Sequence, residues 1–143
     1  MQLPGRCGMD QPQVANIAIV GAGFAGLVSA KVFKDFGWSV TVFEKDSEVG
    51  GVWSSSRRYP GLTTQNVRST YALSDFPYPK DYPEWPSGEQ VQKYMDAYVD
   101  HFGLGGGIAL NTMVDSTTFD EATQSWSVKT SDSLGNHEEK FDF

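Results

Sequence analysis

Residues 16–26 read NIAIVGAGFAG, an apolar run that ends in a G-x-G-x-x-G turn. A helix-forming stretch follows the turn, and a second apolar run, Val40–Phe43, ends in the acidic Glu44. A glycine motif alone is a weak signal. The dinucleotide-binding fingerprint is the ordered series of a strand, a glycine turn, a helix, a second strand and a terminal acid. The order therefore predicts a Rossmann-like α/β fold that binds a dinucleotide.

Each glycine of the turn is needed for a different steric reason. Gly21 permits the tight turn, Gly23 lets the backbone approach a pyrophosphate, and Gly26 lets the helix pack close to the sheet. Unpaired N–H groups and the dipole at the start of the helix then favour the pyrophosphate. Glu44 is placed to accept hydrogen bonds from the adenosine ribose. Because its charge repels a 2′-phosphate, we expect FAD or NAD rather than NADP at this first site.

Length and composition fit a single α/β unit. The chain has 143 residues, of which 39% are hydrophobic and 20% charged, and a net charge of −7. This acidity argues against nucleic acid or an anionic membrane as a partner. A single cysteine cannot form an internal disulfide, and no run approaches membrane-spanning length. We therefore expect a cytoplasmic location.

The first half of the chain alternates strand and helix. Residues 1–13, rich in Pro, Gly and Gln, predict a flexible leader before a domain over 14–143. Ile17–Val20 is apolar throughout, which predicts a parallel strand buried on both faces. A helix is expected over Phe24–Phe36, with Gly37 as its C-cap. Three residues at i, i+4 and i+8 are predicted to cover the sheet: Val28, Val32 and Phe36.

The second half begins with a long irregular segment. The stretch 47–86 is too long for a simple connection, and its aromatic residues predict a packed loop that wraps something. Ser87 and Gln90 have the spacing of a capping box, which predicts a helix through Phe102. Ile108–Leu110 is expected to be a third parallel strand. Alternating patterns then predict an antiparallel β-meander over Val114–Phe119, Ser125–Thr130 and Lys140–Phe143.

Further motifs point to a particular cofactor. Gly50 and Gly51 follow Glu44 by six and seven residues and lead into Val52-Trp53. Paired glycines there let a second backbone segment approach the same nucleotide, as an elongated FAD needs. With Y-P-G at 59–61, S-D-F-P-Y-P at 74–79 and D-Y-P at 81–83, this stretch resembles the flavin-containing monooxygenase family, in which such motifs follow in the same order. The resemblance covers residues 16–143.

The resemblance implies an FAD- and NADPH-dependent monooxygenase. In such enzymes NADPH reduces the flavin, and the reduced flavin captures O₂ as a C4a-hydroperoxide that transfers one oxygen atom to a small-molecule substrate. Asn66 is matched to the family's active-site Asn, but its spacing to Ser74 is one residue short of some members, so Gln65 competes for the role. The cofactor-binding residues that the resemblance implies are Gly21, Ala22, Gly23, Phe24, Ala25, Gly26, Glu44, Lys45, Gly51, Val52 and Trp53.

Members of that family run several hundred residues. Their NADPH-binding glycine motif and the A-T-G strand that closes the flavin domain lie beyond the position of Phe143. We therefore expect residues 14–143 to be the N-terminal portion of an FAD-binding domain, truncated before the NADPH domain, with an unpaired edge on its first strand and no activity alone. The alternative is a non-catalytic dinucleotide-binding or interaction module. An FAD-dependent reductase is disfavoured because no redox C-x-x-C follows the first helix.

Other residues suggest chemistry less specifically. His101 and His137 lack a cysteine or paired acid at ligand spacing, so no metal site is expected. Arg57 and Arg58 could reach a phosphate of FAD or NADPH, or be solvated. Trp53 could pack under the flavin or take part in the chemistry. The aromatic residues from 71 to 85 are expected to form the core of the wrapping loop rather than a substrate cage.

Overall fold

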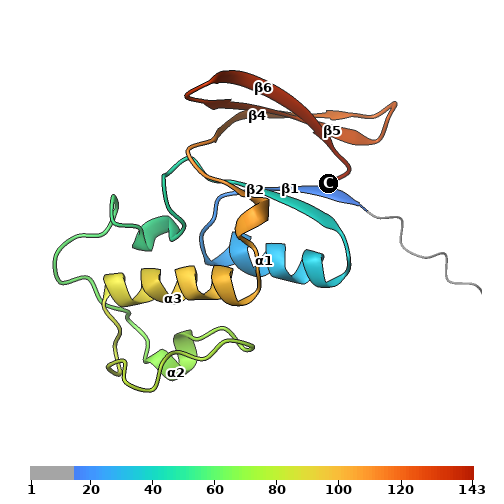
Figure 1. Ribbon diagram of the computed structural model, residues 1–143. Helices are drawn as coiled ribbons and strands as arrows, with labels where there is room; N and C mark the ends of the chain where they lie inside the picture. The colour runs from blue at the N-terminus through green and yellow to red at the C-terminus, as the bar shows by residue number, and fades with distance from the viewer. Residues whose placement is uncertain (1–14) are drawn as a thin grey trace, which may run out of the picture.

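A computed structural model of the chain describes residues 15–143, so the leader expected over 1–13 lies outside the described residues. Three layers are stacked (Figure 1). The helices α1 (Phe24–Asp35) and α3 (Gly88–His101) lie on one side of a parallel sheet, and an antiparallel sheet lies on the other. This is the predicted α/β, Rossmann-like three-layer fold with a β-meander. None of the helices within 15–143 is long and apolar enough to cross a bilayer.

The parallel sheet has the strand order β1-β2-β3. Its strands are β1 (Asn16–Val20), β2 (Ser39–Phe43) and β3 (Ile108–Ala109), and the short 3₁₀ helix η2 (Gly105–Gly107) leads into β3. The prediction that β1 is buried on both faces is wrong for the end of the strand, because Val20 is 64% exposed. The reason is that β1 is an edge strand, which the apolar run alone could not show.

The outer edge of β1 is partly paired. The amide of Asp142 donates to the Asn16 carbonyl, and the amide of Ala18 donates to the Phe143 carbonyl, both at 2.8 Å. The last meander strand therefore ends at Phe141 rather than continuing to Phe143 as predicted. The expectation of an edge without any pairing is corrected accordingly. The start of β1 has backbone partners, whereas Val20 at its end remains exposed.

Helix α1 covers the sheet with a different face from the predicted one. Its buried residues are Leu27 and Ala30, whereas Val32 is 40% and Phe36 66% exposed. The helix is apolar on more than one side, so its periodicity allowed two faces, and the packing of Gly26 against the glycine turn selects the other. Phe36 is the C-cap and contacts the Trp38 ring, with ring centroids 5.7 Å apart. Val28, which was predicted to cover the sheet, is partly buried against the core. Gly37, which was predicted to be the C-cap, lies one position beyond it.

Helix α3 forms as its sequence predicts. Both hydrogen bonds of the capping box are present: the Ser87 hydroxyl accepts from the Gln90 amide, and the Gln90 side chain accepts from the Ser87 amide. The helix ends at His101, with Phe102 as its C-cap. Its buried apolar residues are Val91, Tyr94, Met95, Tyr98 and Val99.

The long segment between β2 and α3 is packed, as predicted. It contains the 3₁₀ helix η1 (Gly51–Trp53) and the short helix α2 (Arg68–Tyr71). Tyr78 is 7% exposed and stacks on Tyr94 of α3, with ring centroids 3.8 Å apart. Tyr71, Phe76 and Tyr82 also pack against this core. The predicted loop core is therefore present, but the prediction is wrong for Trp85, which is 50% exposed.

The meander consists of β4 (Met113–Asp120), β5 (Ser125–Asp132) and β6 (Gly135–Phe141), paired antiparallel. Phe43 of the parallel sheet packs with Val128 and Phe141 in a second core, between the two sheets. The predicted start of the last strand at Lys140 is wrong. Residues 135–140 are all exposed and mostly polar, so they form a ladder without any apolar alternation to reveal it.

Candidate dinucleotide-binding site

The glycine turn at the end of β1 is fixed by the fold at two of its three glycines. Gly21 has a φ of 95°, and its amide donates to the Phe43 carbonyl at 2.8 Å. A Cβ at Gly26 would lie 1.9 Å from the Gly21 carbonyl oxygen, so only glycine fits there. Gly23 differs, because its φ of −83° suits any residue and a Cβ there would lie at an ordinary contact distance, 3.7 Å, from the Gly51 Cα. The fold alone therefore does not explain glycine at 23.

A second glycine turn lies against the first. The Gly50 amide donates to the Ala22 carbonyl at 3.0 Å, which joins the two turns directly. Gly51 has a φ of 55°, and a Cβ there would lie 3.2 Å from the Gly23 Cα. Two backbone segments thus meet with no side chain between them. Such a surface lets a phosphate group approach peptide N–H groups closely.

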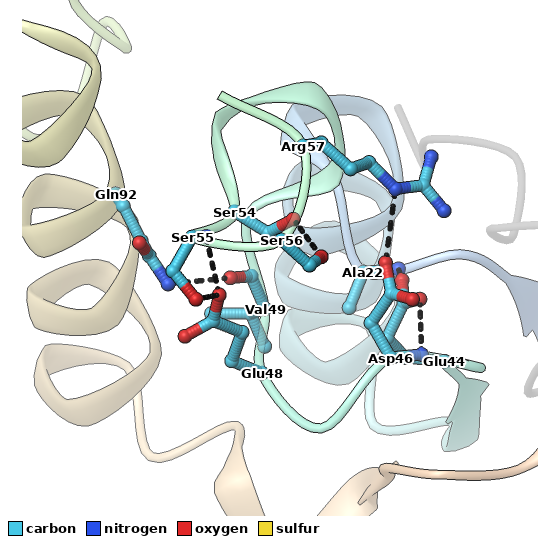
Figure 2. Close-up of polar contacts among 10 residues, drawn as sticks. All are labelled: Ala22, Glu44, Asp46, Glu48, Val49, Ser54, Ser55, Ser56, Arg57 and Gln92. Atoms are coloured by element: carbon cyan, nitrogen blue, oxygen red, sulfur yellow. Dashed lines mark hydrogen bonds and ion pairs between the residues drawn. The ribbon is translucent and has the colours of Figure 1, made fainter. Parts of the chain in front are cut away.

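The Glu44 carboxylate joins the carboxyl ends of β1 and β2 (Figure 2). Glu44 is 5% exposed, and its two oxygens accept from the amides of Ala22 at 2.7 Å and Asp46 at 2.9 Å. The sequence predicted this position but not this structural role. A carboxylate oxygen has a second acceptor site, so Glu44 can also accept from ligand hydroxyl groups.

The first turn of α1 is open at its N-terminus. Its N-cap is Gly23, no side chain caps it, and no acidic residue lies in the first turn. The start of α3, by contrast, is closed by its capping box. The first N–H groups of a helix need partners from outside it, and an anion at this end is also favoured by the helix dipole.

A cleft of about 320 Å³ lies at the carboxyl ends of the parallel strands. Open α/β sheets bind their ligands at this edge. Five of the predicted cofactor-binding residues line the cleft together: Gly21, Gly23, Glu44, Lys45 and Gly51. The other lining residues are Val20, Phe43, Arg57, Thr112, Met113 and Val114.

The remaining predicted cofactor residues lie around the cleft or away from it. Ala22 is fully buried behind the turn, whereas Ala25 is exposed and Val52 is 66% exposed. Phe24 and Trp53 each pack edge-on against Tyr71 of α2, with ring centroids 5.4 and 5.9 Å apart.

Trp53 is 9% exposed, which favours the packing interpretation of this residue over a chemical one. Tyr71 connects both glycine turns to α2 and was missed by sequence reasoning. Nothing in a single sequence distinguishes it from its aromatic neighbours.

The structure does not bring the candidate catalytic residue into this cleft. Asn66 and Gln65 are both exposed in the bend before α2, and neither lines the cleft. Their loop is connected to the site through Tyr71. The choice between the two residues therefore stays open.

A polar network holds the second glycine turn on α3 (Figure 2). Gln92 is 6% exposed. Its side-chain oxygen accepts from Arg58, and its Nε2 donates to the Val49 carbonyl at 3.5 Å. Glu48 accepts from the amide and hydroxyl of Ser55. The Ser55 hydrogen bonds lower the pKa of the Glu48 carboxyl. Sequence reasoning missed this network, although a polar Gln92 on the apolar face of α3 was a visible signal.

The two arginines have different environments. Arg58 points inward and donates to the Trp53 carbonyl at 3.3 Å as well as to Gln92. Arg57 lines the cleft, and its Nε lies 3.0 Å from Asp46 Oδ2. Within residues 15–143 no group of His, Cys, Asp and Glu is arranged to hold a metal ion.

Comparison with known proteins identifies the family. The model for flavin-binding monooxygenase-like proteins matches residues 14–143. The chain belongs to this family. Flavin-containing monooxygenase 1 of Homo sapiens is 34% identical over 111 residues, which are 72% of this chain and 21% of the relative. The chain thus spans about a fifth of the length of this curated relative.

Two solved oxygenase structures share the fold. S-allyl-L-cysteine S-oxygenase from Allium sativum superposes with a TM-score of 0.80 and 28% identity, over 90% of this chain and 35% of that one. An oxidized steroid monooxygenase bound to NADP gives a TM-score of 0.77 and 29% identity, over 87% of this chain and 24% of that one. The mixed α/β arrangement described above is therefore that of FAD-binding monooxygenases.

Proposed function

We propose that this chain binds the adenosine and pyrophosphate half of FAD in an NADPH-dependent monooxygenase. The observation that carries the proposal is the contact between Gly23 and Gly51, where two glycine turns meet beside an uncapped helix N-terminus. Glycine at 23 has no structural necessity in the fold, so a ligand is the simplest reason for it. The family membership supports a flavin as that ligand.

Each part of the cleft has a task in this proposal. The open N–H groups at the start of α1 bind the pyrophosphate, and Gly23 and Gly51 allow its close approach. Glu44 accepts from the ribose hydroxyls while its backbone bonds hold it in place. Lys45 lines the same cleft and adds a positive charge for the phosphates.

A bound flavin would supply the redox chemistry, with a hydride coming from NADPH and O₂ as the oxidant, so that one oxygen atom would enter the substrate and the other would leave as water. NADPH is proposed as the reductant because a structural neighbour was solved with NADP bound. The Asn66 and Gln65 loop is proposed to face the flavin, with Asn66 as the first candidate. Tyr71 packs against both glycine turns and so fixes the position of α2 and of this loop relative to the cofactor site.

The test is FAD binding by the purified protein, followed by flavin fluorescence and calorimetry. We expect one FAD per chain and no retention by Gly23→Val, because its side chain occupies the space of the pyrophosphate. Circular dichroism must show that the variant is folded, as its φ permits. Wild-type flavin content in a folded Gly23→Val protein would refute the site. A folded wild type without FAD affinity would instead favour a non-catalytic interaction module.

A further inference from the structure

Arg57 is the one of the two neighbouring arginines that faces the nucleotide cleft. It lines the cleft together with Gly21, Gly23 and Glu44, whereas Arg58 is engaged by Gln92 on the other side of the turn. Its side chain is 39% exposed, so its charge is accessible from the cleft. Position therefore separates two residues that are equivalent in the sequence.

The guanidinium of Arg57 is held by one of its nitrogens. Nε pairs with Asp46 Oδ2 at 3.0 Å, and Figure 2 shows the two terminal nitrogens projecting beyond this contact. Among the described residues, these terminal nitrogens have no hydrogen-bond partner. Two free terminal nitrogens of a guanidinium can donate hydrogen bonds to two oxygens of one phosphate. Asp46 is itself fixed, because its amide donates to Glu44.

The charges lining the cleft favour a phosphate over a second carboxylate. They are Glu44, Lys45 and Arg57. The Glu44 carboxylate accepts two backbone N–H groups and is assigned to the ribose rather than to the phosphates. Two cations and the open start of α1 then surround the same space.

We propose that Arg57, oriented by Asp46, is a direct ligand of the pyrophosphate of the bound dinucleotide. This inference rests on the proposed function and adds a pair of guanidinium N–H donors to the backbone groups and the Lys45 charge of the pyrophosphate site. Arg57 is thereby assigned to the diphosphate rather than to a 2′-phosphate. The nearby Glu44 carboxylate repels a 2′-phosphate, which supports that choice.

The experiment compares wild type, Arg57→Gln and the control Lys93→Gln. Lys93 lies on α3, pairs with Glu89 and is 64% exposed, so its removal changes the net charge equally at a site away from the cleft. FAD affinity is measured by flavin fluorescence. ADP, adenosine and 2′-AMP are then used as competitors.

We expect Arg57→Gln to weaken the binding of FAD and of ADP by about ten-fold. This is near the lower end of the free energies known for hydrogen bonds to a charged group. Adenosine should compete unchanged, and Lys93→Gln should match wild type with every ligand. Equal ADP affinity in Arg57→Gln and wild type would overturn the inference, as would a loss confined to 2′-AMP or an equal loss in Lys93→Gln. If wild type itself bound no FAD, the proposed function would fail first, so the two failures are distinguishable.

Discussion

Replacing Glu44 by alanine tests how binding and folding are joined at this site. The carboxylate accepts from the Ala22 amide, which is buried, and from the Asp46 amide, which is partly buried. A buried N–H left without a partner costs about 1–3 kcal/mol. Water can reach the Asp46 amide more easily, so we place the total loss at roughly 2–4 kcal/mol. Against a typical stability of about 5–15 kcal/mol, this is a large fraction.

Glu44→Ala should therefore lose stability as well as FAD affinity. A loss of about 2–4 kcal/mol corresponds to a decrease in Tm of roughly 7–13 °C for a chain of this size. FAD affinity should fall by a further ten- to hundred-fold, or about 1.5–3 kcal/mol, because a charged acceptor for the ribose is removed. Urea unfolding without ligand measures the first quantity, and FAD titration well below the Tm measures the second.

Glu44→Gln separates the two contributions. Its amide oxygen can accept from one backbone N–H, so it should recover part of the stability while lacking the charge. An unfolding free energy for Glu44→Ala within about 0.5 kcal/mol of wild type would refute the structural role, since that is the range of neutral surface changes. Unchanged FAD affinity in the folded variant would refute the ribose role.

Three further results are expected. Gly26→Ala should destabilise the fold by about 1–3 kcal/mol in urea unfolding, because its Cβ would lie 1.9 Å from the Gly21 carbonyl oxygen; a loss no larger than that of Gly106→Ala, where a Cβ meets nothing within 4 Å, would contradict this. The lowered pKa of Glu48 contributes stability that is present above the unfolded carboxyl's pKa and is lost as pH falls through the folded value. Urea midpoints between pH 6 and 3 should thus fall less in Glu48→Gln than in wild type, and parallel curves would refute the contribution. The purified 143-residue chain should oxidise NADPH no faster than free FAD, because hydride transfer needs the nicotinamide positioned at the flavin; steady turnover that is lost in Asn66→Ala would show a complete minimal enzyme.

The layers of the fold could be predicted because each has a local signal. The glycine turn predicted the strand and helix on either side of it, and Ser87 with Gln90 predicted the start of α3. The face of α1 could not be predicted, because the helix is apolar on more than one side and tertiary packing selects Leu27 and Ala30. The pairing of Asp142 and Phe143 with β1 was equally hidden, since no pattern in two residues indicates a partner far away in the chain.

The candidate site was predicted as a set of positions rather than as a set of contacts. The spacing of Gly21, Gly23 and Glu44 placed all three at one cleft, as the structure does. Spacing could not show that Glu44 bonds the glycine turn, or that Arg57 and Arg58 face different ways. These features depend on side-chain direction, which a loop without a repeating backbone geometry does not encode.

The most direct test of the central claim is an experimental structure of the protein with FAD. We predict the adenosine in the cleft of about 320 Å³, with its ribose on Glu44 and the pyrophosphate at the start of α1 between Gly23 and Gly51. FAD bound elsewhere on the chain, or bound in the cleft with its pyrophosphate turned away from both glycine turns, would contradict the account.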